Sequence, residues 1–281
     1  MSLPVLLNWP VPKEFKISDG YRHVPSIHSP PIGPENPDGE LSKRELLVAN
    51  SIDHSEYKLS DHPALFLTFA KTEQTRDGIL AFASKYGFIE ESKSLAHYYE
   101  TIEGAKKNNG AERINDRELV EDWIREIRYM NQVVELWLNL DAESKKYVRW
   151  EGYDKVYYDV PNSEPHLIAS KEKNSELLES LRPGDHLGPG QSHLLTRIND
   201  YIRHAYPIMW IVDNKMQPCI QPKSLLNGMW YQLADAVAED RKYKACEYCG
   251  TYFELGVGKA PLTKKYCSDR CRVAANRKKH A

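Results

Sequence analysis

Four cysteines near the end of the chain have the residue type and the spacing of a metal site. Cys246 and Cys249 are separated by two residues, 17 residues follow, and Cys267 and Cys271 are separated by three. Two such thiolate pairs can complete a tetrahedron around one Zn2+ ion and leave no coordination position for a substrate. Because paired cysteines in a reducing compartment indicate metal binding rather than disulfides, the spacing predicts a closed, structural zinc site.

The residues between the thiols predict the elements that hold them. Gly250 permits a tight turn after the first pair. Residues 251–254 favour a short strand, for which residues 264–266 are the expected partner. The second pair lies one helical turn apart, and Ser268 can cap that helix. A pair at a helix N-terminus is typical of a treble-clef finger. The fifth cysteine, Cys219, is expected to be a buried apolar residue.

The end of the chain is basic, whereas the rest is acidic. Residues 241–281 contain 11 Lys and Arg against 3 Asp and Glu, a charge of +8, and the first 240 residues carry −10. This asymmetry predicts that the tail contacts a polyanion. We expect nucleic-acid phosphates to be bound by the cations on and just before the final helix, since Arg and Lys are the usual phosphate contacts. They are Arg270, Arg272, Arg277, Lys278, Lys279, Lys264 and Lys265. The alternatives are a solvated helix end, or a tail that docks on an acidic protein surface.

Helical periodicity dominates the middle of the chain. The clearest helix is predicted where apolar residues recur over about six turns, with Asn115 and Glu118 as a capping box at its start. Its stripe comprises Leu119, Trp123, Ile127, Met130, Val134 and Trp137. Further helices are expected from Pro63 to Phe69, from Ile79 to Tyr86, through Leu95, Tyr98 and Ile102, near 177–181, from Leu194 to Ile202, and from Leu225 to Val237 with Ser224 as cap.

Other segments favour extended structure. Eight of the 17 prolines lie in the first 40 residues, so residues 1–60 are expected to form a Pro-rich extended arm. Hairpins are predicted around Glu151-Gly152 and between residues 208 and 220, and a Gly/Pro loop at residues 183–190. The sequence therefore predicts an α+β fold. A mostly α-helical body with one or two β-hairpins would span residues 1–241. A treble-clef-like four-cysteine zinc finger with a basic helix would span residues 242–281.

The finger resembles the CGNR-type zinc finger of a bacterial protein family. The resemblance lies in Cys246-x2-Cys249-Gly250 and in the run from Tyr266 to His280, YCSDRCRVAANRKKH. In that family the finger follows an α-rich domain called ABATE, and members are regarded as stress-linked transcription regulators. The resemblance implies that the four cysteines bind the metal, and it matches the family's trailing basic pattern to Asn276, Arg277 and Lys278. The Cys-Gly-Asn-Arg run itself is absent, since four residues separate Cys271 from Asn276, and the body resembles such proteins only broadly.

Composition and motifs exclude several function classes. No apolar run approaches the roughly 18 residues of a membrane span, and the N-terminus lacks a signal segment. The sequence therefore predicts a cytoplasmic protein without a membrane partner. It contains no nucleophile motif, no His-Glu-x-x-His and no phosphate loop, so we do not expect an enzyme. The leading hypothesis is a zinc-binding, nucleic-acid-binding, transcription-regulator-like protein. The alternatives are an interaction module with a purely structural finger, whose body contacts a protein or a second copy, and an enzyme with a site in the body that no motif reveals.

Overall fold

The structure is a computed structural model, and most of the chain is described by it. The described residues are 4–24, 40–49, 54–90, 117–140, 147–159, 165–172, 184–212, 214–256, 261 and 263–279. The helices expected through Leu95 and near residues 177–181 lie outside the described residues, as does Asn115. No helix among the described residues is both long and apolar enough to cross a membrane.

Twelve strands form five small antiparallel sheets within the described residues. The sheets pair β1 with β4, β9 with β10 and β11 with β12, and they order the others as β2-β3-β5 and β6-β7-β8. The strands are β1 (Asn8–Pro12), β2 (Phe15–Val24), β3 (Glu40–Ala49), β4 (His54–Lys58), β5 (Arg117–Leu119), β6 (Val148–Glu151), β7 (Lys155–Tyr158), β8 (His166–Ser170), β9 (Tyr206–Val212), β10 (Lys215–Gln221), β11 (Lys242–Ala245) and β12 (Tyr252–Leu255).

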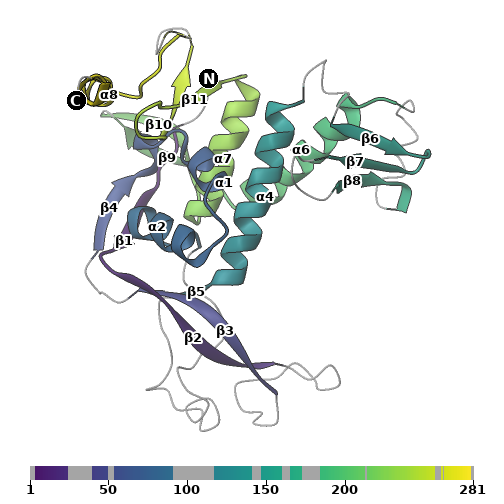
Figure 1. The fold of residues 1–281 in the computed structure, drawn as a ribbon, viewed down its shortest axis with the longest axis horizontal. Helices are drawn as coiled ribbons and strands as arrows, with labels where there is room; N and C mark the ends of the chain where they lie inside the picture. Colours follow the sequence, from purple (N-terminus) through teal and green to yellow (C-terminus); the bar gives the residue numbers. More distant parts are fainter. Residues whose placement is uncertain are drawn as a thin grey trace.

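The helices lie between these sheets. They are α1 (Leu65–Ala70), α2 (Arg76–Tyr86), α4 (Val120–Leu138), α6 (Leu187–Ile202), α7 (Leu225–Ala238) and α8 (Asp269–Lys279), with a 3-10 turn at Leu59–Asp61. Figure 1 shows α1, α4 and α7 side by side at the centre. The β2–β3 ribbon projects from one end, the β6–β8 sheet lies beyond α6, and α8 lies at the opposite side of the molecule from β6–β8.

The prediction of a mostly α-helical body with one or two β-hairpins is wrong. Ten of the strands, in four sheets, precede the finger. The described residues among the first 60, which are predicted as an extended arm, form β1 to β4, and β2 pairs with β3 from Phe15↔Ala49 to Val24↔Glu40. Prolines are compatible with this arrangement because Pro10 and Pro12 lie on β1, which among the described strands pairs with β4 alone. A strand with one free edge tolerates residues that lack a backbone donor.

The apolar stripe of α4 forms the centre of the core, as the periodicity predicts. Trp123, Ile127, Met130 and Val134 are each 0% exposed. Trp123 packs edge-on against Phe69 of α1 and against Phe82 of α2, with ring centroids 6.0 and 5.9 Å away. Helix α4 therefore fixes the positions of both short helices by apolar contact.

Helix α7 connects the core to the cysteines. The Oγ of Ser224 accepts a hydrogen bond from the backbone N–H of Asn227, which confirms the predicted cap. Met229, Trp230 and Leu233 of this helix are fully buried. Only residues 239–241 separate α7 from β11. Because this connection is short, the cysteine segment is held close to the body.

Two local predictions differ from the structure. Glu118 does not belong to a capping box, because it lies in β5 and Leu119 is the N-cap of α4, without a side-chain cap. The predicted Gly/Pro loop at residues 183–190 instead contains the start of α6 at Leu187. There the Oδ1 of Asp185 accepts hydrogen bonds from the N–H groups of Leu187 and Gly188. A helix tolerates proline in its first turn, where backbone N–H groups have no partner within the helix.

Candidate metal centre

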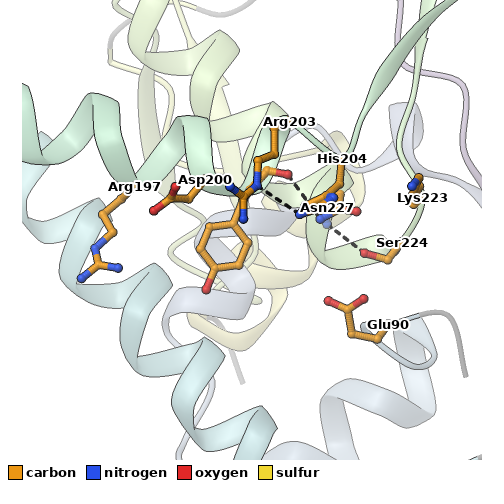
Figure 2. Close-up of a pocket in the computed structure, with 9 residues that line it drawn as sticks. Glu90, Arg197, Asp200, Arg203, His204, Lys223, Ser224 and Asn227 are labelled. Carbon is orange, nitrogen blue, oxygen red and sulfur yellow. Dashed lines mark hydrogen bonds between the residues drawn. The ribbon is translucent and has the colours of Figure 1, made fainter. Parts of the chain in front are cut away.

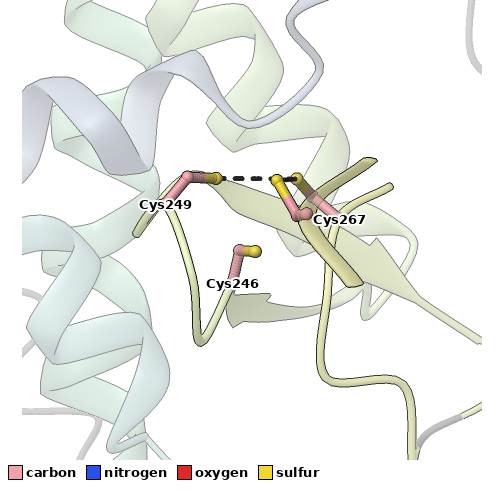
Figure 3. Close-up of side chains that lie close together, drawn as sticks. Cys246, Cys249 and Cys267 are labelled. Atoms are coloured by element: carbon pink, nitrogen blue, oxygen red, sulfur yellow. Dashed lines mark hydrogen bonds between the residues drawn. The ribbon is translucent and has the colours of Figure 1, made fainter. Parts of the chain in front are cut away.

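The first cysteine pair lies on the turn between β11 and β12. The N–H of Cys246 donates to the carbonyl of Thr251, and the N–H of Gly250 donates back to the carbonyl of Cys246, at 3.0 and 2.9 Å. Gly250 has a φ of +73°, in the left-handed region that glycine adopts most easily. These two bonds close the turn, and they place the Cys246 and Cys249 side chains on the same side of it (Figure 3).

The second pair lies at the N-terminus of α8, as the spacing predicts. Cys267 precedes the helix and Cys271 lies in its first turn. The Oγ of Ser268 accepts a hydrogen bond from the N–H of Cys271 at 3.3 Å, which confirms the expected cap. The N–H of Glu247 donates to the carbonyl of Lys265, so the chain before α8 is fixed to the first turn. Two separate segments therefore present two thiols each to one point.

The four sulfur atoms are spaced as a tetrahedral metal site requires. All of them lie within 4.8 Å of one another. The Sγ atom of Cys267 is 3.6 Å from that of Cys249 and 3.5 Å from that of Cys271 (Figure 3 shows the first of these contacts). Four thiolates at about 2.3 Å from a central zinc ion would be about 3.8 Å apart. The arrangement therefore fits a small tetrahedral ion without a large movement of the backbone.

The thiols differ in their ionisation. Burial opposes the charged form of Cys246, but the backbone N–H groups of Cys249, Cys267 and Tyr248 that face its sulfur lower its pKa to about 6. The pKa of Cys249 is also lowered, against burial, by the hydroxyl and the N–H of Thr251. Burial, and then the neighbouring thiols of Cys271 and Cys249, raise the pKa of Cys267 to about 12. Such crowding favours binding of a cation, which replaces the protons shared between the sulfurs.

Aromatic packing and ion pairs attach the cysteine segment to the body. Tyr243 of β11 packs edge-on against Phe66 of α1 at 5.6 Å and against Trp137 of α4 at 6.5 Å. Arg241 pairs with Asp235 of α7 at 2.5 Å and with Glu254 of β12 at 3.8 Å. Neither role is predicted from the sequence, although the alternation Lys242-Tyr243-Lys244 is typical of a strand with one apolar face.

One predicted pairing around the site is wrong. Residues 264–266 are not the strand partner of β12, which pairs instead with β11, from Lys242↔Leu255 to Ala245↔Tyr252. The physical reason is the packing of Tyr243, because burying that ring against the core places β11 beside β12. Cys219, by contrast, is 0% exposed in β10 and lies apart from the four-thiol cluster, in agreement with its predicted burial.

The basic residues predicted to contact phosphates lie on and beside α8. On the helix, Arg270, Arg272, Arg277 and Lys278 are exposed. Lys279 is its last residue, and its side chain lies outside the described part. Before the helix, Lys265 is exposed, whereas half-buried Lys264 lies over the Phe253 ring at 5.4 Å and donates to the carbonyl of Cys267 at 3.4 Å.

Two of these cations also have acidic neighbours. Arg272 pairs with Asp269 at 3.0 Å, and Lys265 lies 3.8 Å from Glu247. Both pairs are exposed, and exposed pairs contribute little to stability, so these cations remain accessible to other anions. The structure thus brings the four thiols together and leaves Arg270, Arg277 and Lys278 exposed on α8.

Comparison with known proteins gives no match of any kind. No known protein family, no curated protein and no solved structure matches the chain. The class that the geometry itself defines is a protein with a cluster of four cysteines, spaced to hold a metal ion, that is packed against a body of helices and small sheets.

Proposed function

We propose that the chain is a zinc-binding protein whose C-terminal module binds nucleic acid through α8. The observation that carries this proposal is the juxtaposition of four converging thiols with the first turn of an exposed basic helix. In this arrangement the metal fixes the end of α8 that begins at Asp269, and the exposed cations extend along the helix away from it.

Zinc is the ion that this donor set favours. Four thiolates are soft ligands, whereas Mg2+ and Ca2+ prefer oxygen donors. Zn2+ accepts tetrahedral geometry readily and has no redox chemistry of its own in such a site. Because all four positions are filled by protein, the ion has a structural role, and we propose a binding protein rather than an enzyme.

Phosphate binding explains the distribution of charge. The terminal 41 residues carry +8 on a chain whose total charge is −2. Arg and Lys on an exposed helix contact phosphates without reading base sequence, so affinity and salt dependence come from them. The resemblance to CGNR-type fingers supports a regulatory role, in which the body would respond to a signal and the finger would hold DNA.

Replacing three exposed cations tests this function. We expect Arg270→Ala/Arg277→Ala/Lys278→Ala to bind duplex DNA more weakly and to reduce the slope of log affinity against log salt by about one unit for each phosphate that the variant no longer binds. Fluorescence anisotropy over a range of salt concentrations measures this slope. Metal content should be unchanged, because the variant retains all four cysteines.

A matched control removes the same amount of positive charge from other parts of the surface. Lys16→Ala/Lys85→Ala/Lys155→Ala removes three exposed cations from β2, α2 and β7. The control should keep the wild-type slope. Equal slopes for both triple variants and the wild type would contradict the assignment to α8. Absence of duplex and single-strand binding by the intact protein at low salt would contradict nucleic-acid binding altogether.

A second function is favoured by the β9–β10 hairpin. Met209, Ile211 and Met216 are 64%, 65% and 79% exposed. The register pairs Ile211 with Met216 and Met209 with Pro218, so all four lie on one face. This face carries no charged side chain and is therefore compatible with a copy of itself, as a two-fold interface requires. We propose it as the contact between two copies of the chain.

The oligomeric state tests this contact. We expect the wild type to sediment as a dimer, and Met209→Glu/Ile211→Glu as a monomer, because the change would bury like charges against one another. Tyr153→Glu is the control, since Tyr153 is 79% exposed at the β6–β7 turn, away from the hairpin. A monomeric wild type, or a dimeric double variant, would rule out this interface.

A further inference from the structure

A polar cavity lies in the body, apart from the four cysteines. It has a volume of about 550 Å3 and is formed by the end of α6, the start of α7 and the residue Glu90 that follows α2 (Figure 2). Binding cavities for small molecules typically measure about 300–1,000 Å3. The cavity is therefore large enough for a small metabolite, and no motif in the sequence indicates it because its residues come from three separate segments.

Cations outnumber carboxylates in the lining. Arg197, Arg203 and Lys223 all line the cavity, and His204 lies beside them. Within the described residues, none of these three cations forms an ion pair with a carboxylate. The Nε of Arg203 donates instead to the Nε2 of His204 at 3.3 Å, and Arg197 lies over the Tyr129 ring at 5.6 Å. Because no carboxylate in the described part of the chain pairs with them, these charges around a concave surface favour an anionic ligand.

Rigid polar groups form one wall of the cavity. Ser224 and Asn227 are 1% and 6% exposed. The Nδ2 of Asn227 donates to the carbonyl of Tyr201 at 3.4 Å, and its N–H donates to the Oγ of Ser224 at 3.2 Å. The bond to the Tyr201 carbonyl joins the start of α7 to the end of α6, so the backbone positions from which the lining side chains project are set before any ligand binds. Preorganisation of this kind reduces the entropic cost of binding.

Two carboxylates complete the lining. Glu90 lies opposite Ser224 in Figure 2, and Asp200 lies on α6 between Arg197 and Arg203. Carboxylates repel a compact polyanion but accept hydrogen bonds from hydroxyl groups. A lining that carries both cations and carboxylates therefore discriminates against a simple inorganic ion and favours a molecule that has both an anionic group and hydroxyl groups.

We propose that this cavity binds a small hydroxylated organic anion of the size of a phosphorylated sugar. Arg203 and Lys223 bind its anionic group, and Glu90 and Asp200 accept hydrogen bonds from its hydroxyls. The proposal goes beyond nucleic-acid binding, because no residue of α8 or of the four-cysteine site contributes to the cavity. The anionic group is a phosphoryl or a carboxylate, since both bind Arg and Lys by the same charge-assisted hydrogen bonds.

Calorimetry with the zinc-loaded full chain tests the proposal with four probes. These are glucose 6-phosphate, gluconate, glucose and inorganic phosphate. We expect one of the two hydroxylated anions to bind, glucose not to bind, and inorganic phosphate to bind more weakly than the favoured anion. The stronger of glucose 6-phosphate and gluconate identifies the anionic group. Absence of binding by both hydroxylated anions, or equal binding of glucose and the favoured anion, would overturn the proposal.

Single substitutions separate the roles of the cations and the carboxylates. Arg203→Gln and Lys223→Gln should each weaken the favoured probe by about tenfold or more, the usual effect of losing a charge-assisted hydrogen bond. Glu90→Gln should weaken that probe but strengthen the binding of inorganic phosphate, because a carboxylate that repels the ion is lost. Lys215→Gln, an exposed cation on β10 outside the cavity, is the control. Wild-type affinity in both cation variants would place the anion elsewhere.

The α8 triple variant distinguishes this site from the proposed finger function. Arg270→Ala/Arg277→Ala/Lys278→Ala should bind the favoured probe as the wild type does, because these residues lie outside the cavity. Loss of DNA binding with retained probe binding would support both assignments independently. Loss of probe binding in this variant would contradict the cavity as the site, whatever its effect on DNA.

Discussion

Loss of the metal is expected to unfold the C-terminal module and to lower the stability of the whole chain. Purified protein should contain about one zinc per chain, the stoichiometry of a four-ligand site. Structural zinc sites contribute roughly 10–16 kcal/mol of binding free energy in finger peptides, and that energy is coupled to folding. Because Tyr243 packs against Phe66 and Trp137, the unfolding of β11 would expose part of the core.

Two measurements test this expected loss of stability. Elemental analysis under reducing conditions gives the metal content, and thermal unfolding with and without a chelator gives the stability. We expect Cys249→Ser and Cys267→Ser each to lower metal retention and the melting temperature, since three thiolates hold zinc less tightly than four. Tryptophan fluorescence should change on chelation, because Tyr243 would leave Trp137.

The fifth cysteine provides the matched control. Cys219→Ala removes a thiol that is 0% exposed in β10 and outside the cluster. It should cost some stability because the buried side chain becomes smaller, while the metal content stays that of the wild type. A wild-type protein without bound metal, or a Cys249→Ser variant that resists chelation like the wild type, would refute the structural site.

The helices could be predicted from the sequence because their signal is local. In α4 and α7 the apolar residues recur every three or four positions, and these positions are the buried ones, as Trp123, Ile127 and Trp230 illustrate. Ser224 could be identified as a cap because its partner, the N–H of Asn227, lies three residues away. Both the apolar periodicity and the N-cap can be recognised within a few helical turns of sequence.

The sheets could not be predicted in the same way because their partners are distant. β3 pairs with β5 through Leu46↔Leu119, a separation of more than 70 residues, and β1 pairs with β4 across the whole β2–β3 ribbon. Several strands have only three to five residues, too few for a period of two to stand out. A composition rich in proline suggested an arm, whereas the pairing of these segments makes them part of the body.

The candidate metal site was accessible from spacing alone, but its surroundings were not. The two short cysteine gaps predict that four thiols converge, and the structure brings them within 4.8 Å. The polar cavity, in contrast, draws Glu90, Arg203 and Lys223 from three segments that only the tertiary fold places together. The role of Glu118 was misread for the same reason, because its hydrogen-bond donors include residues nearly 30 positions earlier.

Glu118 is expected to be one of the residues most sensitive to substitution. Its Oε2 accepts hydrogen bonds from the N–H of Ile89 at 3.2 Å and the Nε1–H of Trp123 at 2.6 Å, and its Oε1 accepts from the N–H of Glu90. Glu118→Ala leaves all three donors without this partner, at a cost of about 3 kcal/mol or more in the free energy of unfolding. Glu118→Gln presents an amide N–H2 group to at least one donor and should cost about 1–3 kcal/mol.

The same carboxyl group should make stability depend on pH. Enclosure of the carboxylate raises the pKa of Glu118 from 4.5 to about 8, although the hydrogen bonds from Glu90, Ile89 and Trp123 lower it. A carboxyl whose pKa is higher in the folded chain stabilises the fold when it is protonated. Its contribution is therefore fully present below 4.5 and is lost as pH rises towards about 8.

Urea unfolding at about pH 6 and about pH 8 isolates this contribution when wild type and Glu118→Gln are compared, because the glutamine does not titrate. The difference in unfolding free energy should shrink at the higher pH, while any effect of pH on the thiols cancels between the two proteins.

Glu121→Gln is the control, since Glu121 is exposed in the first turn of α4 and pairs with Arg44 at 3.1 Å. An exposed pair contributes at most about 1 kcal/mol. A Glu118→Gln variant as stable as Glu121→Gln at both pH values would show that the three donors do not depend on this carboxylate.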